Sequence, residues 1–346
     1  MRLRRISRRI TDQAPSILGA FSWALLLATT SCDRTGKTPD WDLPPVSSEA
    51  ALAAVSPQRD VTHTVPTRSE SPGNGLRFVT YNVENWLTME RLVNGKKVAG
   101  SPKPEEAKQA VIALLARHAP DVIGLCEVGT AADLAEIQER LKAVGLDLPN
   151  THFTGGADPT RHLGLLSKFP ITATARPTVS EYRLGGKTYG ISRGILDASI
   201  AAHGKSYRFL GVHLKSKLET ALGNQEEMRL HEAQLLRRHV DSILHPDPNA
   251  RLVVYGDLND TRASTTLRTI GGKLQTRSYL TAIPACDSHQ ETWTQRWELN
   301  DVYSRFDFIL VSQELRSEVD FPAARILDDP EWSVGSDHRA VMAIFK

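Results

Sequence analysis

The sequence predicts an α/β fold in which two β-sheets pack face to face and helices cover their outer faces. From about residue 76 onward the chain contains many short runs that are apolar nearly throughout, as buried strands require, and few amphipathic segments long enough to be helices. Because such strands need cover on both faces, a second sheet on one side and helices on the other satisfy them.

Three helices are expected between the strands. In the first, at 104–118, apolar residues recur at i, i+3, i+4, i+7 and i+8 from Ala107, and Pro120 ends it. The other two are expected at 132–144 and 225–244. The strands are expected at 77–83, 121–127, 163–166, 195–200, 207–213, 251–255, 306–311 and 340–345.

The first 75 residues differ from the rest. An Arg-rich start and an apolar run, too short for the roughly 20 residues of a bilayer span, predict an export signal at 1–31. Residues 29–32 resemble a bacterial lipoprotein box with Cys32 as the lipidated residue, and a cleaved secretory signal or an uncleaved anchor are the alternatives. Residues 32–75, rich in Pro, Ser and Thr, are expected to be a flexible tether to a folded domain at 76–346.

Charge and cysteine content narrow the class of protein. The formal net charge is +2, but the first 31 residues hold five arginines against one aspartate, so the remainder carries −2. This near-neutral remainder lacks the basic surface of proteins that bind long nucleic acids, which disfavours tight duplex binding but not nuclease chemistry.

Besides Cys32, only Cys126 and Cys286 remain, too few for a disulfide framework, and Cys126 is expected to be a small buried apolar residue rather than a reactive thiol.

Six short motifs place Asn, Glu, His or Asp at the end of an apolar run. They are YNVEN at 81–85, GLCEV at 124–128, GVHLKSK at 211–217, YGDLN at 255–259, SRFDFIL at 304–310 and GSDHRAV at 335–341. In this order the series resembles the endonuclease/exonuclease/phosphatase family, over residues 76–346. The resemblance implies a four-layer α/β/β/α sandwich of two packed, mostly antiparallel sheets, with the site at one end.

The resemblance also implies hydrolysis of phosphate esters by metal-assisted attack of water. Glu127 is then the principal metal ligand, Asn82 assists the metal and the phosphate, and Asp337 adds a second carboxylate. Oxygen donors of this kind suit Mg²⁺ or Mn²⁺, whereas zinc would be expected to use more His and Cys.

For the catalytic residues, the resemblance assigns activation of the water to Asp257 and its orientation to Asn259. These two residues point to the same side if the segment is extended. His338 is expected near the same phosphate, with Asp307 fixing its tautomer. The family leaves open which group takes the proton, and we assign base work to Asp257 and charge stabilisation to His338. His213 would donate to a phosphoryl oxygen or protonate the leaving group.

Four residues are secondary candidates. Lys215 can bind a phosphate or simply be solvated, and Arg193 can clamp a phosphate or form an ordinary ion pair. Arg161 and His162 lie where the family has a site-wall segment. The HLKSK segment at 213–217 resembles a subgroup of secreted bacterial members.

These observations favour an exported divalent-metal phosphodiesterase, with a nuclease as the preferred case. A phospholipid or small-molecule phosphodiesterase or phosphatase is the alternative, and a catalytically silent binding module is a third. A DNA-repair role is disfavoured by export and by the lack of a basic and aromatic run. The expected partners are a phosphodiester substrate such as a nucleic acid and, through Cys32, the membrane, with a monomer and no protein partner expected. The substrate itself depends on loops that the sequence does not specify.

Overall fold

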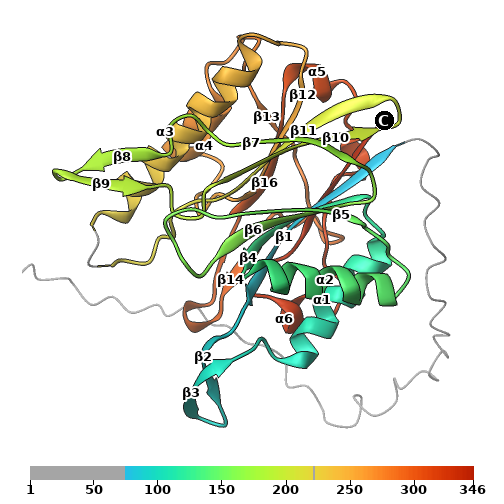
Figure 1. Ribbon diagram of the computed structural model, residues 1–346, viewed down its shortest axis with the longest axis vertical. Helices are drawn as coiled ribbons and strands as arrows, with labels where there is room; N and C mark the ends of the chain where they lie inside the picture. The colour runs from blue at the N-terminus through green and yellow to red at the C-terminus, as the bar shows by residue number, and fades with distance from the viewer. Residues whose placement is uncertain (1–74, 221–222) are drawn as a thin grey trace, which may run out of the picture. The chain divides into compact units, whose positions relative to one another are not determined.

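The structure is a computed structural model that describes residues 75–220 and 223–346. The export signal expected at 1–31 and the tether expected at 32–75 therefore lie, apart from Gly75, outside the described residues. Two sheets pack together and helices lie on their outer faces (Figure 1). None of the helices in the described part of the chain is both long and apolar enough to cross a membrane.

The first sheet has the strand order β17-β18-β1-β4-β6-β5. Its strands are β1 (Leu76–Trp86), β4 (Val122–Val128), β5 (Asn150–Thr154), β6 (His162–Ser167), β17 (Arg325–Ile326) and β18 (Val341–Phe345). In this sheet β1 and β4 run parallel, and the other pairings are antiparallel. The parallel pair thus lies in the middle of the sheet.

The second sheet repeats this plan, with the order β13-β16-β12-β11-β10-β7. Its strands are β7 (Ile171–Ala175), β10 (Ile195–Ala202), β11 (Lys205–His213), β12 (Arg251–Asp257), β13 (Thr281–Ala282) and β16 (Asp307–Val311). Here β11 and β12 are the central parallel pair, and the other pairings are antiparallel. The prediction of two packed, mostly antiparallel sheets is confirmed.

The helices cover the two outer faces. They are α1 (Glu105–His118), α2 (Ala131–Ala143), α3 (Gln225–Leu244), α4 (Thr265–Gly271), α5 (Gln313–Arg316) and α6 (Trp332–Gly335), with short 3₁₀ turns η1 (Glu298–Asn300) and η2 (Phe321–Ala323). Apolar side chains of α1 and α2 pack on the first sheet, and those of α3 and α4 pack on the second. The three helices expected from periodicity agree with α1, α2 and α3 to within one residue at each end.

Three hairpins in the described part of the chain lie outside the two large sheets. They pair β2 (Met89–Val93) with β3 (Lys96–Ser101), β8 (Glu181–Leu184) with β9 (Lys187–Gly190), and β14 (Gln295–Trp297) with β15 (Val302–Ser304). The sequence pattern did not predict them, because their residues are largely exposed and form no apolar run. Figure 1 shows β2–β3 and β8–β9 projecting from the body of the fold.

Aromatic rings fill the core between the sheets. The Phe78 ring centroid lies 5.0 Å from that of Phe209 and 4.9 Å from that of Tyr255. Two glycines make room for Tyr255, since a Cβ atom would lie 2.0 Å from its ring at Gly124 and 2.5 Å from its hydroxyl at Gly211. Gly124 lies on β4 of the first sheet and faces Tyr255 across the core, so this contact limits the separation of the sheets, whereas Gly211 is paired with Tyr255 within the second sheet.

Candidate active site

The predicted site residues meet where the central strands of both sheets end. Asn82 lies on β1 and Glu127 near the end of β4, while His213 and Asp257 are the last residues of β11 and β12. In the second sheet His213 is paired with Asp257, and Asp257 is paired with Asp307, the first residue of β16. Register therefore places three functional side chains side by side on adjacent strands.

The backbone departs from regular strand geometry at this end of the sheets. Glu84, Asn85 and Glu127 have φ angles of +43°, +56° and +66°, in the left-handed region that non-glycine residues seldom adopt. Glu127 also lies at a register shift between β4 and β6, and such a bulge re-aims a side chain out of the usual alternation. Backbone strain of this kind clusters at functional sites.

Asp257 and Asn259 are joined by a turn rather than by an extended segment. β12 ends at Asp257, and Asn259 has a φ of +48°. The main-chain N–H of Asn259 donates to Asp257 Oδ1 at 2.8 Å, and its side-chain Nδ2 donates to the carbonyl of Leu214 at 3.0 Å. The two residues are close, as expected, but the left-handed turn brings this about and not strand alternation.

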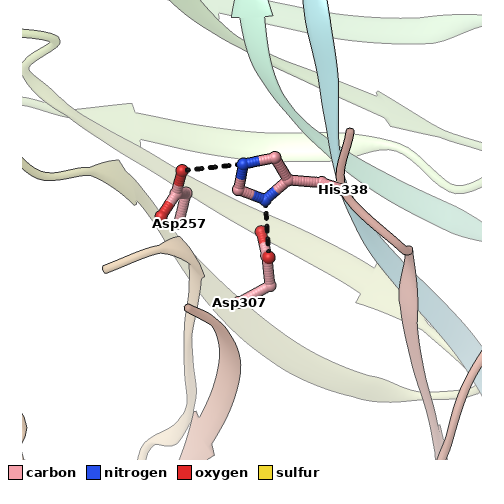
Figure 2. A group of neighbouring side chains, drawn as sticks. All are labelled: Asp257, Asp307 and His338. Carbon is pink, nitrogen blue, oxygen red and sulfur yellow. Dashed lines mark hydrogen bonds and ion pairs between the residues drawn. The ribbon is translucent and has the colours of Figure 1, made fainter. Parts of the chain in front are cut away.

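A buried Asp–His pair forms the centre of the site (Figure 2). His338 Nδ1 lies 2.8 Å from Asp307 Oδ2, and its Nε2 lies 3.7 Å from Asp257 Oδ2. Because Nδ1–H donates to Asp307, the other ring nitrogen is directed toward Asp257. The His338 main chain is held as well, since its N–H donates to Ser336 Oγ at 3.0 Å and that hydroxyl donates to the carbonyl of Asn82 at 2.8 Å.

The buried carboxylates shift the titration of these groups. Burial disfavours the imidazolium of His338, but the negative charges of Asp307 and Asp257 outweigh it and hold its pKa well above the ordinary value. Burial raises the pKa of Asp257 to about 7, and the charge of Asp307 adds to the shift while that of His338 opposes it. At neutral pH the site therefore holds a protonated imidazole beside a carboxyl group close to its own midpoint.

His213 differs from His338 in its charge state. Its Nε2 lies 3.5 Å from Asp257 Oδ2 and 4.0 Å from Glu127 Oε1, and its Nδ1 is buried with no hydrogen-bond partner in the described residues. Burial, followed by the positive charge of Arg193, lowers its pKa well below the ordinary value. His213 is thus a neutral imidazole that can donate one hydrogen bond.

Two nitrogen donors hold the carboxylate of Glu127, the predicted principal metal ligand. Its Oε2 accepts the N–H of Asn85 at 2.8 Å, and its Oε1 lies 3.4 Å from Asn82 Nδ2. Asp337, the third predicted ligand, has a carboxylate oxygen 4.0 Å from His338 Nε2, and 43% of its side chain is exposed.

The charges of this group fit a divalent cation. Burial raises the pKa of Glu84, the charges of Asp337 and Glu127 add to the shift, and the positive charge of Lys103 opposes it, so carboxylates at this end of the sheets repel one another in part. A hard cation bound by the oxygens of Asn82, Glu127 and Asp337 would relieve this repulsion.

A second group also offers ligand atoms. Those of Asp257, Asp307 and His338 all lie within 4.8 Å of one another. There, however, His338 Nδ1 already donates to Asp307, and a cation would have to displace that hydrogen bond. A cation bound by this group would therefore compete with the Asp307–His338 pair.

Of the secondary candidates, Arg161 contacts a predicted site residue, whereas Arg193 and His162 contact other residues. Arg161 Nε donates to Asn85 Oδ1 at 2.8 Å and lies 3.9 Å from Glu127 Oε2. Arg193 forms the ion pair that was one of its two alternatives, with Nε 3.4 Å from Asp158 Oδ2. His162 Nδ1 lies at hydrogen-bond distance from the carbonyl of Gly129.

Glu232 is a residue near the site that the sequence pattern did not indicate. Its buried carboxylate, on α3, accepts the main-chain N–H groups of Ser192 and Lys215, each at 2.7 Å. Ser192 directly precedes Arg193, and Lys215 directly follows the His213–Leu214 segment, so the Glu232 side chain connects both segments to α3. The available signal was a glutamate within the buried stripe of α3, four residues after Met228.

Sequence comparison accounts for this arrangement. The profile of the Endonuclease/Exonuclease/phosphatase family matches residues 93–338 of the chain. The chain belongs to this family. Members of the family are phosphoric ester hydrolases that depend on a divalent metal, and the described residues include one group, Asp257, Asp307 and His338, whose ligand atoms could hold such an ion. No curated protein matches the chain.

Solved structures share the endonuclease/exonuclease/phosphatase fold at low sequence identity. A family protein from Leptotrichia buccalis is 15% identical, with a TM-score of 0.55 over 78% of this chain and 99% of that one. Beta toxin from Staphylococcus aureus is 15% identical, with a TM-score of 0.55 over 78% of this chain and 100% of that one. The human Nocturnin catalytic domain with bound sulfate is 17% identical, with a TM-score of 0.54 over 79% and 94%. At these identities the likeness concerns the fold.

Proposed function

We propose that this protein is an exported, metal-dependent phosphodiesterase that acts on nucleic acid. The observation that carries the hydrolytic part is the buried Asp307–His338 pair directed at Asp257, beside the oxygen donors of Glu127 and Asn82. A buried cation beside a carboxylate of raised pKa is the arrangement that general-base hydrolysis of an anionic ester needs.

In the proposed reaction Asp257 removes a proton from the attacking water while the water oxygen bonds to phosphorus. With a pKa of about 7, this carboxylate can accept a proton near neutral pH. The bond to the leaving oxygen then breaks, and that oxygen takes a proton from solvent. A Mg²⁺ or Mn²⁺ ion held by Asn82, Glu127 and Asp337 would neutralise charge on the phosphoryl oxygens.

The two histidines would act on the phosphoryl group without accepting the proton. His338, charged because of Asp307, stabilises the negative charge that grows on the phosphoryl oxygens. His213, neutral because it is buried, donates a hydrogen bond to a phosphoryl oxygen. Its lowered pKa favours this role over protonation of the leaving group.

A substrate panel tests the proposal. The full chain, purified in detergent with Mg²⁺ or Mn²⁺, would be assayed on plasmid, single-stranded DNA, RNA, sphingomyelin and bis-p-nitrophenyl phosphate, with His338→Ala as the inactive control. We expect metal-dependent cleavage of a nucleic acid. Preferential hydrolysis of sphingomyelin would favour the phospholipid alternative, and no turnover of any ester by the folded wild type would leave a silent binding module.

Export and anchoring through Cys32 complete the proposal, and they concern residues outside the described part of the chain. They rest on the apolar run before Cys32 and on the tether that follows it. Cys32→Ser should release the protein from the membrane fraction, or leave its signal uncleaved, without changing catalysis in detergent extract. Unchanged fractionation with normal processing would overturn the lipid anchor.

A further inference from the structure

A cavity of about 620 Å³ opens beside the strand that begins with Asp307. Its volume lies within the range of roughly 300–1,000 Å³ that is typical of ligand sites. Apolar side chains, among them Ile283, Phe308 and Phe321, form one part of its lining, and Arg262 and Arg305 form another. The described residues that line it include neither aspartate nor glutamate.

Neither arginine of this cavity forms an ion pair with a carboxylate within the described residues, although the nearby charge of Asp307 acts on Arg305. The Arg305 guanidinium donates to three main-chain carbonyls, those of Asp307 at 2.7 Å, Ala285 at 3.0 Å and Thr292 at 3.1 Å. Arg262 is exposed and makes no hydrogen bond or ion pair within residues 75–220 and 223–346. Carbonyl groups fix the direction of a guanidinium but leave its charge free to attract an anion.

Both arginines come from segments that also carry site residues. Arg305 precedes Asp307 by two positions, and its Nε donates to the Asp307 carbonyl. Arg262 follows Asn259 by three positions, in the loop after β12. The cavity is therefore lined by residues of the two segments that carry Asn259 and Asp307.

We propose that the cavity is a subsite for the nucleotide next to the scissile phosphate. Its phosphate would be bound by Arg262 and Arg305, and its base would contact the apolar wall at Phe321. Base contacts with aromatic side chains tolerate any sequence, because every base has a π-face. A subsite of this kind suits a single strand, whose bases are free to enter a cavity. The inference rests on the proposed nuclease function and deepens it.

The test compares two substrates in the full chain with bound Mg²⁺ or Mn²⁺. A short single-stranded oligonucleotide can fill the subsite, whereas bis-p-nitrophenyl phosphate has no neighbouring nucleotide. For Arg262→Ala we expect the ratio of kcat/KM for the oligonucleotide to that for the small ester to fall about tenfold, mainly through KM. The salt dependence of log(kcat/KM) for the oligonucleotide should become shallower by about 0.7, as for one lost contact to a single strand.

Arg277→Ala is the matched control, because Arg277 is an exposed arginine outside the cavity, and it should change neither quantity. Phe321→Ala should lower the same ratio without changing the salt dependence. If Arg262→Ala leaves the ratio of the two kcat/KM values unchanged, the subsite is wrong but the nuclease function stands. If the wild type hydrolyses the small ester but not the oligonucleotide, the nuclease function and the subsite are both wrong.

Discussion

Replacement of Asp307 by Asn tests the buried pair on which the proposed catalysis depends. The substitution keeps the size of the side chain but removes the charge 2.8 Å from His338 Nδ1. In the wild type, burial lowers the pKa of His338, and the charge of Asp307 does more than any other group to raise it. In the variant that pKa should fall, and His338 should lose its proton within the neutral range.

The size of the effect follows from the loss of a hydrogen bond to a charged group. A hydrogen bond to a charged group contributes about 1.5–3 kcal/mol. Since about 1.4 kcal/mol corresponds to a tenfold change in rate, kcat should fall roughly 10- to 150-fold. The alkaline limb of the kcat profile should also move to lower pH, because His338 of the variant deprotonates closer to the ordinary histidine pKa of about 6.5. The assay is kcat against pH on bis-p-nitrophenyl phosphate, with circular dichroism as a check of folding.

The chain contains a matched control for this experiment. Asp197 also receives a buried histidine, with His239 Nε2 2.8 Å from its Oδ2, but this pair lies between β10 and α3, away from the candidate site. Asp197 binds Arg208 as well, through contacts of 2.6 and 2.8 Å. Asp197→Asn should therefore lower the thermal stability and leave the pH profile of kcat unchanged. A folded Asp307→Asn with the wild-type kcat and pH profile would refute our account of the pair.

Three other perturbations have definite expected outcomes. EDTA should abolish turnover, and Mg²⁺ or Mn²⁺ should restore it. The Glu127→Gln variant should need a much higher metal concentration for activity. Activity of this variant in EDTA would refute the metal assignment. Asp257→Asn should lower kcat by on the order of 10² or more and remove the acidic limb of the wild-type profile. That limb reflects a pKa of about 7 and should move to lower pH as metal saturates, since a cation favours the carboxylate. In Glu232→Gln the single carbonyl oxygen can accept only one of the N–H groups of Ser192 and Lys215, so the free energy of unfolding should fall by about 1–3 kcal/mol. KM should rise more than kcat falls. An unchanged KM would mean that Glu232 does not position the site.

The sequence by itself determined the elements whose signals are local. Apolar periodicity located α1, α2 and α3, because one face of each helix is buried along its length. The motifs at the ends of apolar runs also identified which residues gather at the site. A polar residue at a strand end is visible in a short window, and six such windows in one order indicated the family and the fold.

The tertiary structure decided what depends on contacts between distant segments. Register placed His213, Asp257 and Asp307 on adjacent strands, and no local pattern carries that pairing. No local pattern distinguishes Glu232 from other helical glutamates either, because its two N–H donors, Ser192 and Lys215, lie in other segments of the chain. Arg262 and Arg305 likewise share one cavity only because the chain returns to it. Periodicity reports which face of an element is buried, whereas packing decides what that face meets.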